Sequence, residues 1–208
     1  GRNLYPLVDK ILHDLDGILD EVASLKALKR GLVRVAAPQL MASTLLPEVI
    51  AAYARVHPEV TIRLVDCVVE SVISRVFSGE VDFGVGPERE PNSDIAADTL
   101  FELPFMAVFP PGHRLAARPD LRWADLMGHP FISLQGQFTE RLTGDLRQAV
   151  RDLTLAPTNE VAFMSTALAM VSAGLGVTVC IPYAASLVRL YRLEMRPLSD
   201  PVVARRFY

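Results

Sequence analysis

Hydrophobic residues recur every three or four positions along the first part of the chain. One step of four stands where a strict heptad would take three. This pattern predicts a long amphipathic helix over residues 4–29 with a coiled-coil-like seam, and Gly31 predicts its end. The seam requires a partner, either the helix of a second subunit or the body of the same chain. The seam residues are Leu4, Leu7, Ile11, Leu15, Ile18, Val22, Leu25 and Leu28.

Beyond Gly31, apolar runs and amphipathic segments alternate in the manner of βαβ units with a parallel sheet. A loop over residues 38–42 should lead to a helix capped by Ser43 or Thr44, because Pro47 is tolerated only in a first turn. A short helix should follow the second strand and end at Gly79. The strands are expected at residues 32–37, 60–66 and 81–85, with short runs at 100–101 and 104–109 crossing to another sheet.

The second half repeats this logic with other residues. Thr139 is the candidate cap of one helix, and Ser165 or Thr166 that of another, closed by Gly174. Strands are expected at residues 131–134, 160–163 and 177–181, and returning strands at 190–195 and 203–207. Two similar α/β halves with helix N-termini facing a shared cleft are typical of a hinged binding protein. The expected division is a helix over 1–30, a first subdomain of 31–102 with 199–208, and a second subdomain of 103–198.

The loops after corresponding strands are the predicted binding site. They offer amide, hydroxyl and helix-end donors but no Lys or Arg, so we expect a small, singly charged ligand with an apolar body, such as a carboxylate. Ser165 and Thr166 could instead be helix caps alone, and the apolar members Leu40, Met41 and Phe138 with Met164 could be plain core. The full set is Pro38, Gln39, Leu40, Met41, Ser43, Thr44, Gly86, Pro87, Gln135, Gln137, Phe138, Met164, Ser165 and Thr166.

Composition narrows the function classes. The 208 residues carry 21 Lys and Arg against 24 Asp and Glu, a net charge of -3, so the chain by itself should not grip DNA. Cys67 and Cys180 each follow an apolar run, which favours reduced, buried thiols. The four histidines lie far apart in sequence, and no nucleophile or metal-ligand motif is present, so we expect no catalytic site, metal or cofactor. No apolar run approaches the about 20 residues of a membrane span.

Several segments, in order, resemble a known family. The long helix runs into GLVRVAAP and STLLPEVIAAYARVHPEVTIRL, followed by SGEVDFGVGP, LPFMAVFPPGHRLA and ALAMVSAGLGVTVCIP. Over essentially the whole chain this resembles the linker helix and effector-binding domain of a LysR-type transcriptional regulator. The resemblance implies two Rossmann-like subdomains with a hinge, as in type 2 periplasmic binding proteins, preceded by the linker helix. A small-molecule inducer would occupy the cleft.

The resemblance also implies partners and a location. These are a cytoplasmic homodimer or homotetramer, and promoter DNA contacted only through an N-terminal winged helix-turn-helix domain that this chain lacks. In the oligomer, linker helices would pair, and the helix near Leu45–Val56 would contact the helix near Leu142–Leu153 of a neighbour.

One departure concerns the loop after the first strand, where the family often has a hydroxyl residue that contacts the inducer. This loop contains Pro38, Gln39, Leu40 and Met41. The contact must therefore move to Ser43 or Thr44, or be lost. Two alternatives share the fold. A solute-binding protein of a transport system is disfavoured by the dimer-type helix and the lack of a signal sequence, and an enzyme by the lack of a catalytic set.

Overall fold

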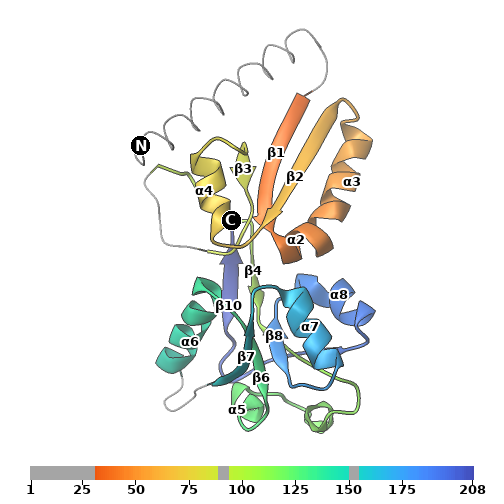
Figure 1. The fold of residues 1–208 in the computed structure, drawn as a ribbon, viewed down its shortest axis with the longest axis vertical. Coiled ribbons are helices and arrows are strands. Elements are labelled where there is room, and N and C mark those ends of the chain that lie inside the picture. Colours follow the sequence, from red (N-terminus) through yellow and green to blue (C-terminus); the bar gives the residue numbers. More distant parts are fainter. Residues whose placement is uncertain (1–30, 89–93, 150–154) are drawn as a thin grey trace, which may run out of the picture.

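The structure, a computed structural model, describes residues 31–88, 94–149 and 155–208, so the helix predicted over 4–29 lies outside the described residues. The described part forms two α/β subdomains, one above the other in Figure 1, joined by two strands that cross between them. This arrangement confirms the predicted fold class. No helix in the described part is both long enough and apolar enough to span a bilayer.

The first subdomain is built on a parallel sheet with the order β2-β1-β3. Its strands are β1 (Gly31–Pro38), β2 (Val60–Cys67) and β3 (Phe83–Gly84), and its helices are α2 (Gln39–Thr44), α3 (Leu46–Val56) and α4 (Ser71–Phe77). Successive residues of β1 face opposite sides, so Val35 joins the core that contains Leu46, whereas Ala36 packs with Val72. Both faces of β1 are therefore covered, which explains its continuous apolar run.

The second subdomain holds two small sheets. In one, β5 (Met106–Phe109) lies antiparallel between β8 (Thr178–Cys180) and β9 (Glu194–Pro197); in the other, β6 (Phe131–Leu134) pairs in parallel with β7 (Pro157–Val161). The helices are α5 (Trp123–Leu126), α6 (Gln137–Ala149), α7 (Met164–Ser172) and α8 (Ala185–Leu190), with 3-10 turns η1 (Arg114–Ala117) and η2 (Pro182–Ala184).

The hinge consists of β4 (Phe101–Pro104) and β10 (Ala204–Phe207), which pair antiparallel. Phe207 is fully buried, and its ring lies 5.2 Å from that of Phe101 and 5.5 Å from that of Tyr183. Its core cluster includes residues of both subdomains. The hinge is thus a packed apolar element and not an open linker.

The loop predicted over residues 38–42 is wrong, because α2 begins at Gln39, directly after β1. Gln39, Leu40 and Met41 are good helix formers, and they follow a proline whose fixed φ suits a helix start. The predicted caps are also wrong at this place: Ser43 and Thr44 lie within α2, and both hydroxyls donate to the Leu40 carbonyl, at 3.2 and 2.7 Å. Helix α3 does begin just before Pro47, as predicted.

Strand β7 begins at Pro157, three residues before the strand expected over 160–163, and ends at Val161; two further boundaries also differ from prediction. Helix α6 begins at Gln137, so Thr139 is inside it and not its cap; Gly136 turns the chain, and its carbonyl accepts from the Thr139 N–H at 3.1 Å. The strand expected over 190–195 starts only at Glu194, because the apolar residues before it form α8, which buries Val188. Arg192, at φ 56°, then turns the chain into β9.

Candidate functional site

The starts of three helices face the junction between the subdomains. Strand β1 leads into α2, β6 into α6 and β7 into α7, and in Figure 1 each of these helices begins near the junction. The first N–H groups of a helix have no partner within it and carry the positive end of its dipole. The junction is therefore lined by backbone donors from both subdomains.

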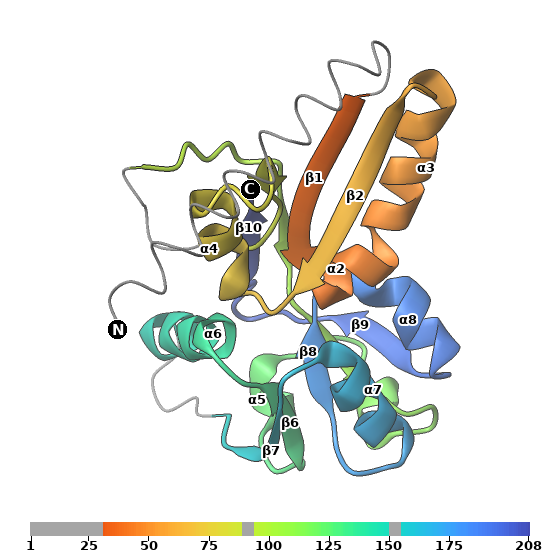
Figure 2. The same ribbon diagram turned by 45° about the horizontal axis from the view of Figure 1, so that its top comes forward.

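The first subdomain contributes Pro38, Gln39 and Leu40 at the start of α2. Pro38 is buried, and the amide oxygen of Gln39 is buried with no hydrogen-bond donor among the described residues. Leu40 crosses the junction and packs against the core of the second subdomain. Figure 2 shows why: α2 lies between the ends of β1 and β2 and helix α8, which it contacts. Met41 is fully buried in the core, the second of the two roles considered from sequence.

The second subdomain contributes the first turns of α6 and α7. Gln137 and Phe138 begin α6, with side chains outside the described set, and Gln135 is exposed just before it. Ser165 is half-buried and Thr166 is exposed, both in the first turn of α7. Neither hydroxyl caps the N-terminus of this helix. The prediction of caps here is wrong because Phe163 occupies the cap position. Met164 is buried in the second subdomain's core.

Gly86 and Pro87 lie at the hinge. Gly86 exchanges two backbone hydrogen bonds with Tyr208, at 3.0 and 2.9 Å, and Pro87 forms a bridge with Phe207. They also line a cavity of about 1040 Å³ beside α4, whose walls include Val72, Phe83 and Arg141. A second cavity of about 380 Å³ lies between α6 and β6. Of the predicted site residues in the described part, these two cavities include only Gly86 and Pro87.

Charged contacts between the subdomains were not predicted from sequence. The Glu88 carboxylate lies 3.7 Å from the Arg141 guanidinium of α6 and 2.6 Å from that of Arg206 in β10. Buried Arg205 pairs with Asp145 of α6 at 3.1 Å; burial lowers the pKa of Arg205, and the Asp145 charge opposes that shift. These partners are far apart in sequence, and no periodic pattern links them. They fix α6 to the hinge strand.

Other titratable groups lie away from the junction. His113 and His129 are brought together at the far end of the second subdomain, with ring centres 4.7 Å apart, although nothing in the sequence predicted this pair. Burial raises the pKa of the Cys180 thiol to about 12, and burial also raises that of Cys67. Within the described ranges, no three His, Cys, Asp or Glu residues gather as metal ligands would. Asp82 has a structural role: it accepts from the Arg34 N–H at 2.6 Å.

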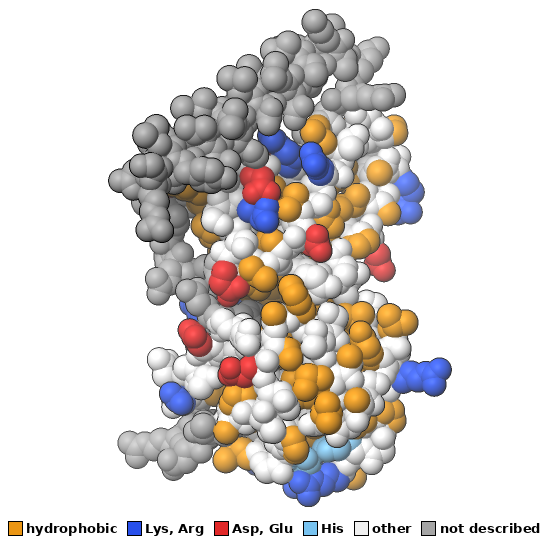
Figure 3. Space-filling model, in the orientation of Figure 1, with side chains coloured by type: hydrophobic (Ala, Val, Ile, Leu, Met, Phe, Trp, Pro, Cys, Tyr) orange, Lys and Arg blue, Asp and Glu red, His pale blue; other side chains and the backbone are white. Residues whose placement is uncertain are grey.

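Figure 3 shows the character of the surface around the junction. Hydrophobic side chains gather over α7 and α8, and charged side chains are sparse there. The arginines visible on this face stand over the first subdomain and at the edges. Together with the helix starts, this describes a site suited to hold a polar or acidic group by backbone donors and an apolar body by side chains.

The chain is similar in sequence to known transcriptional regulators. A regulator from Escherichia coli strain K12, the uncharacterized HTH-type transcriptional regulator YbhD, is 26% identical over 211 residues, covering 99% of this chain but only 65% of the regulator. The chain thus spans about two thirds of the length of that relative. Such relatives are transcriptional regulators, which does not favour the solute-binding alternative.

Solved structures show the same fold. The effector-binding domain of QuiR in complex with shikimate has a TM-score of 0.75 at 17% identity, covering 86% of each chain. The BenM effector-binding domain with benzoate has a TM-score of 0.73 at 21% identity, covering 85% of this chain and 82% of that one. A family model described as the LysR substrate binding domain matches residues 26–208. The chain belongs to the LysR substrate binding domain family.

Proposed function

We propose that the chain is the ligand-sensing part of a LysR-type transcriptional regulator and that its effector binds at the junction between the subdomains. The observation that carries the proposal is the buried amide oxygen of Gln39, which lacks a donor among the described residues. A buried acceptor without a partner is costly, and a ligand that donates to it removes that cost. Gln39 is the first residue of α2.

We propose a small carboxylate with an apolar body as the effector class. The N–H groups at the starts of α6 and α7 suit one negative charge, and Ser165 adds a hydroxyl. The nearest arginine of α6, Arg141, is already paired with Glu88, so its guanidinium is not available to bind a second negative charge. QuiR and BenM, which share the fold, are complexed with shikimate and benzoate, both carboxylates.

The proposed mechanism is a shift of populations without covalent chemistry. An effector that touches both subdomains favours the arrangement in which both sets of contacts are made, and only this differential affinity can change the hinge. The change would pass to a winged helix-turn-helix domain outside this chain, in a regulator acting in the cytoplasm. The subdomain limits proposed from sequence put one crossing within β4, between residues 102 and 103, and the other between residues 198 and 199, before β10.

We also propose an oligomer, dimer or tetramer. On α3, Val49, Tyr53 and Val56 are exposed at spacings of four and three residues, which puts them on one face. Val56 is 72% exposed. An exposed apolar stripe of this kind is typical of a subunit interface. The partner surface proposed from the family resemblance is α6 of a neighbour.

Calorimetry with a panel of carboxylates, including benzoate and shikimate, tests the proposed site. A Ser165→Ala, Thr166→Val double variant should bind its best ligand more weakly by roughly 1–3 kcal/mol, because polar contacts at the start of α7 are lost. A Ser74→Ala, Thr61→Val variant, altered at exposed positions of α4 and β2, is the matched control. Equal affinity in the double variant and the wild type would remove these residues from the site. A preference for phosphorylated sugars would remove the carboxylate class.

A further inference from the structure

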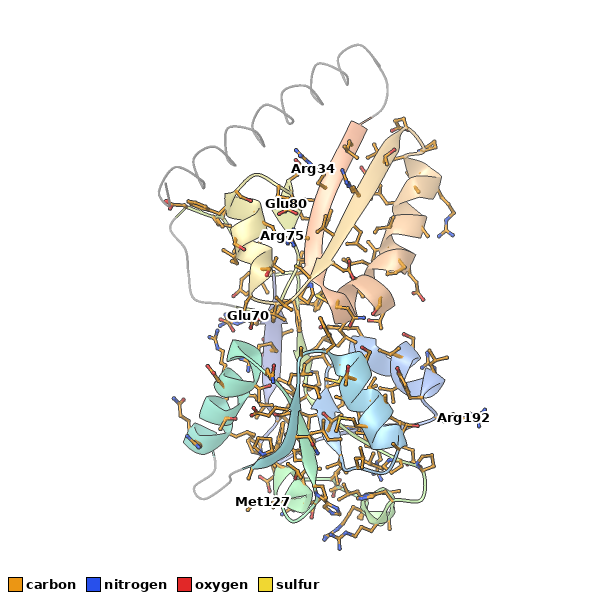
Figure 4. The ribbon with its side chains drawn as sticks, viewed as in Figure 1. Arg34, Glu70, Arg75, Glu80, Met127 and Arg192 are labelled. Carbon is orange, nitrogen blue, oxygen red and sulfur yellow. The ribbon has the colours of Figure 1, made fainter. Side chains whose placement is uncertain are left out.

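Glu70 reaches from the first subdomain to the second. It lies in the turn between β2 and α4, immediately before Ser71. Figure 4 shows it at the junction, close to where α6 begins. The side chain is engaged and not free. No sequence pattern marks it, since an acidic residue before a short helix is ordinary.

The Glu70 carboxylate rests on the backbone of Gly136. A Cβ atom placed on Gly136 would lie 2.7 Å from Glu70 Oε1, closer than real Cβ atoms come, and 3.3 Å from Glu70 Cδ. Gly136 also has φ +93°, a left-handed conformation that other residues rarely adopt. Glycine at this position is therefore required by the turn, and it leaves room for an acidic group of the other subdomain beside the backbone.

Gly136 stands at the positive end of a long helix. Its carbonyl accepts from the N–H groups of Thr139 and Glu140, at 3.1 and 3.3 Å, so it is the residue from which α6 starts. Helix α6 runs for 13 residues, and the N–H groups of its first two residues have no acceptor within the helix. A carboxylate at this place is stabilised by those groups and by the helix dipole.

A second acidic residue of the first subdomain acts on the same helix. Glu88 pairs with Arg141 of α6, and the Arg141 guanidinium also donates to the Glu88 carbonyl at 3.4 Å. Glu70 and Glu88 thus approach the start of α6 from the same subdomain. Because Glu88 neutralises the charge of Arg141, the start of α6 is the positive feature that is left to bind an acid group at this place.

We propose that Glu70 is a tethered carboxylate that occupies the start of α6 in the effector-free state, and that an effector must displace it to place its own acid group there. This inference rests on the proposed function and deepens it, because it makes Glu70 an internal competitor that holds the subdomains together until the effector arrives. A tethered group competes at a high effective concentration, so it sets the affinity threshold for the effector.

Hydrogen exchange of the backbone amides tests the contact without any ligand. In Glu70→Ala, the amides of residues 137 and 138 should exchange faster by on the order of 10-fold, because these N–H groups have no acceptor within α6 and lose a charge-assisted one. Glu59→Gln, which removes one exposed negative charge from the same subdomain just before β2, away from α6, should leave these rates near those of the wild type. Unchanged rates in Glu70→Ala would overturn the contact.

Calorimetry of Glu70→Gln against the wild type, with benzoate and shikimate as probes, tests the displacement. The affinity of a probe should rise on the order of 10-fold in Glu70→Gln and not in Glu59→Gln. If a probe binds the wild type and binds Glu70→Gln no more tightly, the displacement is overturned and the proposed function stands. Binding of no probe, even to Glu70→Gln, overturns the displacement together with the carboxylate class, and the exchange rates then decide only the contact.

Discussion

Single backbone positions determine how closely the segments of the second subdomain approach one another. Gly176, at φ +152°, lies so near the chain before β6 that an added Cβ would come within 2.3 Å of the Pro130 carbonyl oxygen. The same carbonyl accepts from the Val177 N–H at 2.9 Å. The Pro130 carbonyl belongs to backbone that is fixed by this hydrogen bond, so it cannot shift to make room for a Cβ atom without a large cost in free energy. From sequence, Gly174 was explained as a helix end; the close approach at Gly176 required knowledge of what lies opposite.

Gly176→Ala should therefore destabilise the fold by roughly 3 kcal/mol or more, from strain and from the displaced backbone. Gly128→Ala is the matched control: its φ is +83°, but nothing lies within 4 Å of its added Cβ, so only the conformational cost of about 1–2 kcal/mol remains. Urea unfolding of both variants gives the comparison. Equal losses of stability would show that the close approach at Pro130 is of no consequence.

The paired histidines give a pH dependence whose sign follows from their environment. Burial, and then the charge of Arg114, lowers the pKa of His113 below its ordinary 6.5; burial, Arg114 and His113 lower that of His129. Because the pKa values are lower in the folded protein, the unfolded chain binds more protons in this range. The contribution of the two histidines to the free energy of unfolding is therefore present above pH 6.5 and is lost as the pH falls from there toward the lowered pKa values. His129→Phe should lose less stability than the wild type between pH 7 and 5. A larger loss in the variant would contradict the assignment.

At the scale of elements, periodicity predicted the parts that bury one face against a sheet. The strand β1 and helix α3 were expected nearly where they lie, because their apolar spacing reflects burial directly. Helix α2 was missed because six residues are too few for a period, and its two hydroxyls suggested a cap for the next helix. The strand expected over 190–195 failed for a related reason: a short apolar run fits a helix end as well as a strand.

The exposed face of α3 yields a prediction about assembly. Val49→Asp with Val56→Asp should lower the mass measured by sedimentation at tens of micromolar, because charge is placed on the proposed interface. Val202→Asp, at a side chain of similar exposure (69% against 72% for Val56) but outside α3, should behave like the wild type. The proposed interface would be contradicted if the wild type sedimented as a monomer or if the α3 variant had the same mass as the wild type.

At the scale of the whole molecule, the order of strands and helices predicted two halves whose helix starts face each other. What it could not predict is how the halves touch. Glu70 with Gly136, and Glu88 with Arg141, join residues distant in sequence, and one-dimensional periodicity carries no information about such pairs. The candidate loops were also too inclusive: Met41 and Met164 are core side chains, and Gly86 and Pro87 belong to the hinge.

The central claim, that an effector binds between the subdomains, is tested most directly by hydrogen exchange of the chain with and without the tightest-binding carboxylate of the panel. We expect protection at the starts of three helices, residues 39–44, 137–140 and 164–167, because a ligand at the junction contacts both subdomains. The cavity beside α4 provides the contrasting outcome, since its walls are formed mainly by the first subdomain. Protection confined to that cavity, at residues 72–77 and 94–100, would contradict the account.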